Sequence, residues 1–412
     1  MNSLLSNVDP RVKEILQKEL IRQQNTLSLI PSENYASKAV LEAQGSVLSN
    51  KYAEGYPGKR YYQGCQFVDE IEELSIQRAK KLFKCEHANV QVHSGTQANM
   101  AVYQALLELG ETILSLGLAE GGHLSHGGKG TFPYKYYHIV NYGLDKASER
   151  FDYEEIRQIA NKSHPRLIIV GTSAYPRRID FLAWKEIAEE VGAYLLADMA
   201  HLIGLIAAGV HPDPVPYVDI VTATTQKTLR GPRGGLILCR KKFASLIDRA
   251  VFPAIQGGPF MHTIAAKSVC FKEAKEPGFK DYQKQVLSNA KILAKVLKER
   301  GFRLISGGTD NHLLLIDVFS KGMSGDKAAN LLEEAGIIVN KNSIPFDTRS
   351  PFSPSGIRLG TPAITTRGMK ESEIKIIGEW VSEILLQPED KILRKRIREK
   401  VKKICKKFPI YK

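Results

Sequence analysis

The chain has 412 residues, of which 43% are hydrophobic and 25% are charged, a composition that fits a globular protein of two or three domains and excludes a disordered, collagen-like or coiled-coil chain. No apolar run reaches about 18 residues, and charges come too early for a secretory signal, so we expect neither a transmembrane helix nor export. Five scattered cysteines without a CxxC pair predict a reducing cytoplasm, rather than a disulfide framework or a zinc ribbon; they are Cys65, Cys85, Cys239, Cys270 and Cys405.

The net charge of +14 comes from 58 basic and 44 acidic residues. Eleven Lys or Arg residues and one acid, Glu399, lie between residues 391 and 412, so this segment alone supplies +10. Two interpretations stay open. The segment is either a tail that binds RNA or a membrane, or the solvated face of a terminal helix, which is the usual meaning of a charge run.

The N-terminal pattern predicts an amphipathic helix over residues 8–24. Asp9 is placed to cap this helix, and Pro10 occupies its first position, where the missing proline N–H does no harm. An irregular stretch rich in Gly, Tyr and polar residues follows at 27–65. Such a long stretch is typical of a functional loop or a linker.

From residue 67 onward, helical and strand patterns alternate. The predicted helices are 68–83, 96–109 and 182–192, and the predicted strands are 89–95, 166–174, 193–198, 218–225 and 234–239. Strands that alternate with helices predict an α/β fold with a large, doubly wound, mostly parallel sheet.

After about residue 275 the pattern changes to that of a smaller α+β domain. The predicted helices are 280–301, 324–336 and 370–386, and the predicted strands are 312–318, 337–342 and 356–364. We therefore expect an N-terminal helical arm (1–25), a large domain (26–275) and a small C-terminal domain (276–412).

In open α/β sheets, ligands bind at the carboxyl ends of the strands. The strand predicted at 89–95 runs through His93 and Ser94 into Gly95 and Thr96, where a helix begins. Small residues at a helix N-terminus leave backbone N–H groups free and form a phosphate cradle. The same residues also suit any tight strand–turn–helix, so this signal is weak by itself.

Asp198 ends the apolar strand predicted at 193–198. A carboxylate there is costly to bury unless it meets a cation. It could instead cap the segment that follows, or form an Asp-x-x-His metal pair with His201. No further ligands stand at metal-site spacing nearby, so we predict no metal.

Lys227 follows the strand predicted at 218–225, between threonines and a Gly/Pro/Arg loop. A lysine at a crowded, partly desolvated strand end has a lowered pKa and can act as an amine nucleophile. The alternative is an ordinary surface lysine, which the small polar neighbours disfavour.

The cradle, the acid and the lysine, 29 residues after the acid, stand in chain order. Pyridoxal phosphate needs these three groups: an anchor for its phosphate, a carboxylate for its ring nitrogen, and an amine for its aldehyde. Arg358, in the predicted small domain, suits bidentate capture of a carboxylate, which favours an amino-acid substrate.

With these three groups in this order, the chain resembles the serine hydroxymethyltransferase family. The members of this family are fold-type-I pyridoxal-phosphate enzymes. The matching segments stand in the family's order and spacing across residues 8–410: IPSEN, NKYAEGYPGKRYYQGC, VQVHSGTQAN, GGHLSHG, GTSAYPR, DMAHLIGLIAAG, TTQKTLRGPRGG, QGGP, SGGTDNH, VNKNSIP, SPF and SGIRLGTPA.

The resemblance implies roles for residues around the cofactor. Lys227 carries pyridoxal phosphate as a Schiff base, Asp198 pairs with its ring nitrogen, and His123 stacks on its ring. The remaining cofactor contacts are Ser94, Gly95 and Thr96 at the phosphate, Tyr52 and Gly258 from a neighbouring subunit, and Ser173 and His201 near the ring oxygen.

The resemblance also implies that tetrahydrofolate accepts the hydroxymethyl group of serine. Glu54, donated by the neighbouring subunit with Tyr61 beside it, is the acid/base residue, so a homodimer, alone or within a tetramer, is expected. The substrate contacts are Ser32, Tyr62 and Arg358, with Arg233 positioning a nearby loop. The folate contacts are Leu118, Gly122, His123, Leu124, Asn342, Ser350, Pro351 and Phe352.

One departure stands beside the lysine. The family has histidine immediately before the Schiff-base lysine, whereas this chain has Gln226. Glutamine keeps a hydrogen-bonding side chain of similar reach but takes up no proton near neutral pH. Gln226 therefore puts the preference for L-serine over α-methylserine or threonine-type substrates in question.

Two other functions remain as alternatives. One is a folate-independent aldolase on the same scaffold, motivated by Gln226 alone. The other is an RNA-binding or structural protein that acts through residues 391–412, for which Lys227 would be dispensable.

Overall fold

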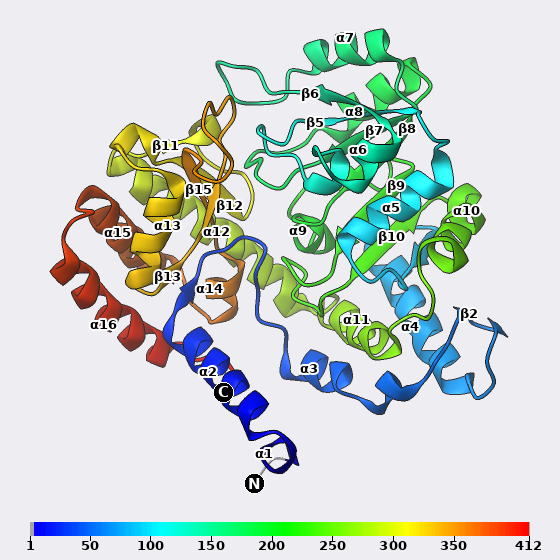
Figure 1. Ribbon diagram of the computed structural model, residues 1–412, viewed down its shortest axis with the longest axis horizontal. Coiled ribbons are helices and arrows are strands. Elements are labelled where there is room, and N and C mark those ends of the chain that lie inside the picture. The colour runs from blue at the N-terminus through cyan, green and yellow to red at the C-terminus, as the bar shows by residue number, and fades with distance from the viewer. Residues whose placement is uncertain (1–3, 412) are drawn as a thin grey trace.

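A seven-stranded sheet forms the centre of the larger lobe in the computed structural model, which describes residues 4–411 (Figure 1). Its strand order is β4 (His87–Asn89), β10 (Gly235–Cys239), β9 (Ile220–Thr224), β8 (Tyr194–Asp198), β7 (Leu167–Gly171), β5 (Thr112–Leu116) and β6 (His138–Tyr142). Strand β10 runs antiparallel to both of its neighbours, β4 and β9, and the other neighbouring strands are parallel. The predicted α/β class with a mostly parallel sheet is confirmed.

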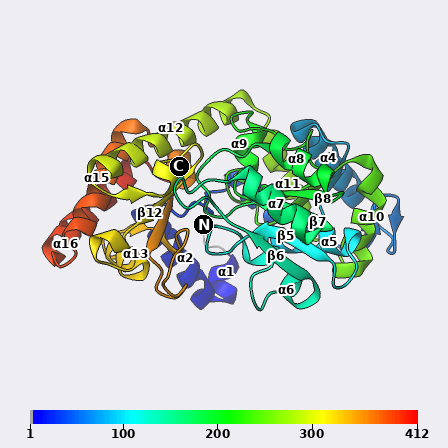
Figure 2. The same cartoon turned by 90° about the horizontal axis from the view of Figure 1, so that it is seen from above.

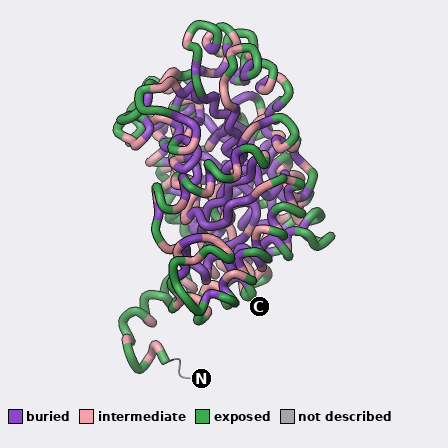
Figure 3. The backbone as a smooth tube through the Cα atoms, turned by 90° about the vertical axis from the view of Figure 1, so that its right-hand side faces the viewer, coloured by how far each residue is buried: buried purple, intermediate pink, exposed green. Residues whose placement is uncertain are grey.

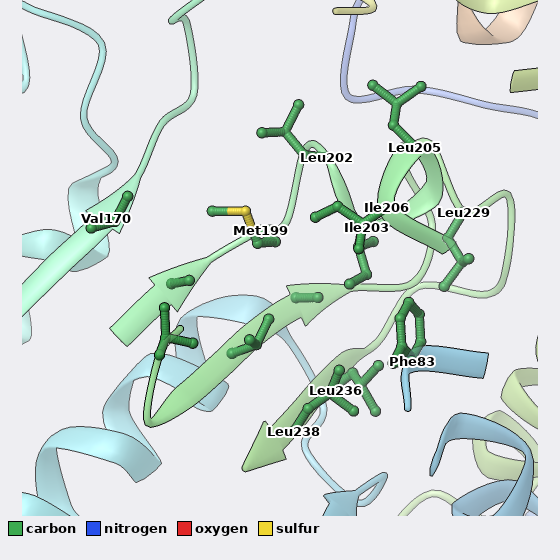
Figure 4. Packing of buried hydrophobic residues seen from close by; sticks show 14 of the residues in the cluster. Phe83, Val170, Met199, Leu202, Ile203, Leu205, Ile206, Leu229, Leu236 and Leu238 are labelled. Atoms are coloured by element: carbon green, nitrogen blue, oxygen red, sulfur yellow. The ribbon is translucent and has the colours of Figure 1, made fainter. Parts of the chain in front are cut away.

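The central strands are buried along nearly their whole length because helices cover both faces of the sheet. Strands β7, β9 and β10 are buried at every residue, as expected for a parallel sheet inside an α/β domain. Figure 4 shows Phe83, Val170, Met199, Leu236 and Leu238 in this core. The helices of this lobe are α3 (Lys38–Gln44), α4 (Gln66–Phe83), α5 (Gly95–Leu106), α6 (Phe132–Tyr136), α7 (Tyr153–Ser163), α8 (Phe181–Glu190), α9 (Ile203–Ala207), α10 (Ala244–Arg249) and α11 (Met261–Glu273).

A four-stranded antiparallel sheet and its helices form the second lobe, and α12 (Pro277–Glu299) runs between the lobes (Figure 2). The sheet order is β11 (Arg303–Leu304), β12 (Leu313–Asp317), β15 (Gly356–Gly360) and β14 (Asn340–Asn342). The helices are α13 (Gly325–Glu334), α14 (Pro362–Thr366), α15 (Glu371–Leu386) and α16 (Lys391–Lys407). Two hydrophobic cores meet on α12, where Val286 belongs to the first and Ala290 to the second.

Three predicted strands differ from the observed ones. The strand predicted at 356–364 ends at Gly360, because helix α14 begins at Pro362. The other two differ in their pairing. The strand predicted at 89–95 shares only Asn89 with the observed β4, because the register with β10 runs from His87 opposite Cys239 to Asn89 opposite Ile237. The strand predicted at 337–342 is divided. β13 (Ile337–Ile338) pairs with β1 (Leu27–Ser28), whereas β14 pairs with β15. Residue 27 therefore lies in the second core, although we assigned it to the large domain.

The N-terminal arm consists of α1 (Leu4–Val8) and α2 (Pro10–Asn25). Asp9 caps α2 as predicted, since its carboxylate accepts a hydrogen bond from the Val12 N–H at 2.9 Å. Figure 3 shows the arm projecting from the body, and no residue of α1 or α2 is buried.

Helix α16 carries most of the basic C-terminal segment. Its apolar side, with Leu393, Ile397 and Val401, is buried in the second core. Its outer side exposes Lys395, Arg396, Lys400, Lys403, Lys406 and Lys407. The run is thus the solvated face of a docked helix, as one of the two interpretations expected. Among the described residues we find no helix with the length and hydrophobicity of a transmembrane span.

Candidate active site

A cavity of about 200 Å³ opens at the carboxyl ends of β7, β8 and β9. Its lining includes ten of the residues singled out from the sequence: Ser94, Gly95, Thr96, His123, Ser173, Asp198, His201, Gln226, Lys227 and Arg233. Because parallel strands end at one edge of the sheet, residues up to 139 positions apart in sequence meet there. The cavity also contains His126, Thr172, Ala200 and Thr224.

The N-terminus of α5 forms one wall of the cavity. Ser94 caps this helix, and its Oγ accepts a hydrogen bond from the Gln97 N–H at 3.2 Å. A Cβ atom at Gly95 would lie 2.6 Å from Cγ2 of Thr224, so the close approach requires glycine. The free N–H groups of the first turn and the helix dipole make this wall suitable for a phosphate.

Asp198 is a buried carboxylate with three hydrogen-bond donors. Its Oδ2 lies 2.8 Å from Nε2 of His126 and 2.8 Å from Nδ2 of Asn99, and its Oδ1 accepts from the Ala200 N–H. Burial would raise the pKa of Asp198, but the bonds to His126 and Asn99 and the nearby imidazoles lower it well below the ordinary value. Asp198 therefore stays ionised at the end of β8.

His126 and Asn99 were not predicted as functional residues. Thr222 Oγ1 donates to Asn99 Oδ1 at 2.6 Å, which directs the Asn99 amide N–H toward Asp198. The only sequence signal was the second histidine of GGHLSHG, three residues after His123. Asn99 lies inside α5, and nothing in the sequence around it indicates that it binds Asp198, which is 99 positions away.

Lys227 lines the same cavity just beyond β9. Burial lowers the pKa of Lys227 to about 8, with a further effect from the cations Arg358 and Arg233, while Asp198 opposes the shift. A lysine amine with such a pKa is in part unprotonated at neutral to mildly basic pH and can attack a carbonyl carbon.

Arg358 reaches the site from β15 of the second lobe. Its Nη1 donates to the main-chain carbonyl of Ser173, and its Nε donates to Oδ1 of Asn340 at 3.2 Å. Burial lowers the pKa of Arg358 to about 10, so the guanidinium remains charged at neutral pH. His123, by contrast, is neutral, because burial lowers its pKa to about 4.

Ser32 lies in a neighbouring cavity of about 480 Å³. Gln226 and Arg233 line both cavities. The Gln226 Oε1 accepts a hydrogen bond from the Gly234 N–H at 3.3 Å. Gln226, which stands where the family has histidine, thus lies between Lys227 and the second cavity.

Tyr52, Glu54 and Gly258, which were predicted to act across a subunit interface, form a separate cluster in this chain together with Tyr61 and Tyr62. Tyr52 and Tyr62 meet edge to face at 5.1 Å, and the Tyr62 hydroxyl donates to Glu54 at 3.4 Å. Gly258 faces the ring of Tyr52, and Tyr61 packs against Phe252. Tyr52 and Tyr61 are 57% and 73% exposed.

Of the residues predicted to contact folate, His123 lines the cavity and the other seven do not. Leu118, Leu124 and Phe352 are exposed, the last at 84%, and so are Ser350 and Pro351. Gly122 packs so closely that a Cβ would lie 2.2 Å from the Leu116 carbonyl oxygen. The Asn342 amide donates to the Ser343 carbonyl at 2.7 Å.

Asp198 and His201 do not form a pair. Nδ1 of His201 lies 3.3 Å from Nε2 of His312, while Asp198 is bound by His126 and Asn99. Within residues 4–411, no group of three or more His, Cys, Asp or Glu side chains is arranged to hold a metal ion.

A family model described as serine hydroxymethyltransferase matches residues 5–381. The match includes the N-terminal arm, the cavity, the tyrosine cluster and Arg358, and it ends before α16.

Proposed function

The chain belongs to the serine hydroxymethyltransferase family, and from this membership we propose which of its residues carry out the family's reaction. That reaction is the reversible transfer of the serine hydroxymethyl group to tetrahydrofolate, which gives glycine and 5,10-methylenetetrahydrofolate. The enzyme depends on pyridoxal phosphate.

The assignment rests on one observation: the amine of Lys227, the ionised carboxylate of Asp198 and the N-terminus of α5 line the same cavity. They fit the aldehyde, the ring nitrogen and the phosphate of pyridoxal phosphate. We assign these contacts to Lys227, Asp198 and the Ser94–Thr96 turn. When bound, pyridoxal phosphate supplies an electron sink for negative charge at the substrate Cα.

Residues in and beside the cavity also orient the cofactor and select the substrate. Asp198, held ionised, favours a protonated ring nitrogen, and the neutral imidazole of His123 offers a flat face for stacking. Ser173 and His201 supply hydrogen bonds near the ring oxygen. Arg358 receives the substrate carboxylate, because a charged acceptor binds a guanidinium more strongly than the carbonyl it now contacts.

Glu54 and its tyrosine neighbours are assigned to the active site of a second copy of the chain. Exposed aromatic side chains beside a carboxylate favour an interface role, and the cluster is not part of the lining of this chain's own cavity. We therefore propose a homodimer, alone or within a tetramer, in the cytoplasm. The five cysteines are all free thiols, which supports a reducing compartment.

The rate at which the cofactor-free chain takes up pyridoxal phosphate should depend on pH through Lys227. Only the unprotonated amine attacks the aldehyde, and the pKa of Lys227 is lowered by burial to about 8. The rate should therefore rise about tenfold per pH unit below pH 8 and level off above it. Stopped-flow absorbance measures it, and a midpoint near the ordinary lysine pKa of about 10.4 would contradict the assignment.

The experiment that tests the function compares serine cleavage with and without tetrahydrofolate. The wild-type chain should need folate for rapid turnover, whereas equal rates without it would identify the aldolase. Measuring serine, α-methylserine and allo-threonine in the same assay tests Gln226. We expect Gln226→His to shift the ratio toward serine by roughly tenfold, the effect of about one hydrogen bond. An unchanged ratio would remove Gln226 from specificity.

A further inference from the structure

The residues that lead into the Ser94–Thr96 turn are buried but lie beyond the paired part of the sheet. Strand β4 ends at Asn89, and residues 90–93 then run directly to Ser94, the cap of α5. Residues 90–92 are all buried. Since buried main-chain N–H and C=O groups need hydrogen-bond partners, something other than a neighbouring strand must supply them here.

Lys267 of α11 holds residues 90–93 at two points. Its Nζ donates to the carbonyls of Val90 and Val92 at 2.6 and 3.0 Å. The side chain is 1% exposed, and it packs against Gly234, where a Cβ would lie 2.5 Å from the Lys267 Cε. Gly234 belongs to the loop that follows Lys227. Lys267 therefore lies between the segment that leads to the phosphate turn and the loop that follows the Schiff-base lysine.

A lysine is a costly choice for this position. Its buried neighbours on α11 include the apolar residues Ile264, Ala266 and Cys270, so an apolar side chain would suit the surroundings. Burial lowers the pKa of Lys267 to about 7, against the opposing effect of the Glu72 carboxylate. Lysine is rarely buried unless its amine is paired, and here the amine is paired with the main chain that precedes the phosphate turn.

Gln256 holds the same segment at two further points. Its Nε2 donates to the carbonyl of Gln91 at 3.0 Å, and its Oε1 accepts from the His93 N–H at 3.2 Å. One amide side chain thus binds a main-chain acceptor and a main-chain donor, as an adjacent strand would. Together, Lys267 and Gln256 contact the main chain of each residue from 90 to 93.

We propose that Lys267 and Gln256 are positioning residues for the phosphate of the cofactor, because they take the place of a neighbouring strand along residues 90–93 and thereby fix the Ser94–Thr96 turn. Their role rests on the proposed function, which supplies the phosphate as the ligand of this turn. Neither residue lines the cavity, so both act through the main chain. Hydrogen bonds weaken steeply when donors leave their alignment, and a displaced turn should bind a phosphate less tightly.

The first test compares how the cofactor-free protein binds pyridoxal phosphate and pyridoxal, which lacks the phosphate. Lys267→Met keeps the length of the side chain but donates no hydrogen bond. We expect its preference for pyridoxal phosphate, measured as the ratio of the two Kd values by absorbance titration, to fall at least about tenfold, the effect of one hydrogen bond to a charged group. The affinity for pyridoxal should stay close to that of the wild type. An unchanged ratio would overturn the role of Lys267.

Gln256→Leu tests the second pair of contacts and decides the question if Lys267→Met does not fold. We expect the same ratio to fall and amide hydrogen exchange over residues 90–97, followed by mass spectrometry, to become faster, because the His93 N–H loses its acceptor. The exchange measurement matters because Gly258, two residues after Gln256, is itself assigned to a phosphate contact. A lower ratio without faster exchange over residues 90–97 would assign the effect to Gly258 and overturn the proposal.

Asn289→Leu is the matched control for general loss of stability. Asn289 is also fully buried, and its Nδ2 donates to the main-chain carbonyl of Met369 at 3.0 Å, but it is not in the cavity lining. We expect a lower Tm with an unchanged ratio. If the ratio fell as far as in Lys267→Met, it would follow stability alone, and the proposal would be wrong.

The wild-type chain separates this proposal from the proposed function. A wild type without any preference for pyridoxal phosphate over pyridoxal would contradict the phosphate site itself, and with it the roles of Lys267 and Gln256. A wild-type preference that both variants retain would contradict only those two roles.

Discussion

Lys227→Ala should abolish covalent attachment of pyridoxal phosphate and lower kcat for serine cleavage by about 10³-fold or more, as removal of a covalent catalyst does. The wild-type protein should be yellow, and borohydride reduction should fix the cofactor to the peptide that contains Lys227. Mass spectrometry of the reduced protein measures this attachment, and the variant should show none.

No substitute amine is available from the nearest buried lysine of the same lobe. The Lys267 Nζ donates to the carbonyls of Val90 and Val92 at 2.6 and 3.0 Å, so its donors are committed to the main chain. Lys280→Ala, at an exposed position on α12, is the matched control and should behave as the wild type. A reduced Lys227→Ala protein that still carried the cofactor, or retained full activity, would disprove the assignment.

Glu54→Gln should leave cofactor binding intact and lower hydroxymethyl transfer by about 10²–10⁴-fold, the usual contribution of a general acid or base. The amide keeps the size of the carboxylate but neither takes up nor releases a proton. Cofactor binding should survive because Glu54 is not in the lining of the cavity that contains Lys227. Absorbance titration and the folate-coupled assay separate the two effects.

Mixing the two inactive variants tests whether Glu54 acts across an interface. In a hybrid dimer, one site combines Lys227 from the Glu54→Gln chain with Glu54 from the Lys227→Ala chain. Random exchange of subunits in a two-fold dimer should then restore about a quarter of the wild-type activity. No recovery, after exchange has been verified by a tag on one chain, would place Glu54 in the site of its own chain.

Local sequence patterns predicted the site residues that stand directly at the end of a strand. Asp198 and Lys227 could be found because an apolar strand that ends in a charged residue is visible within a few positions. The arm helix could be found because Asp9 and Pro10 are start signals for the residues beside them. These features depend on short-range physics, and the structure places them where the pattern indicated.

The contacts that tune those residues depend on the assembled fold. His126 and Asn99 bind Asp198 across 72 and 99 positions, and His312 reaches His201 from the other lobe across 111. No periodicity links such pairs, because strand order and lobe packing decide which of them meet. The strand predicted at 89–95 was misplaced for a similar reason, since only the register with β10 shows that the paired residues are His87–Asn89.

The uneven distribution of charge gives the molecule a permanent electric dipole. The segment at 391–412 holds +10 of the +14 net charge, and α16 lies at the outer edge of the smaller lobe (Figure 1). Near an anionic surface, the molecule will turn this end toward the surface. Since the screening length is about 8 Å at physiological ionic strength, this orientation arises only at close range and weakens as salt is added.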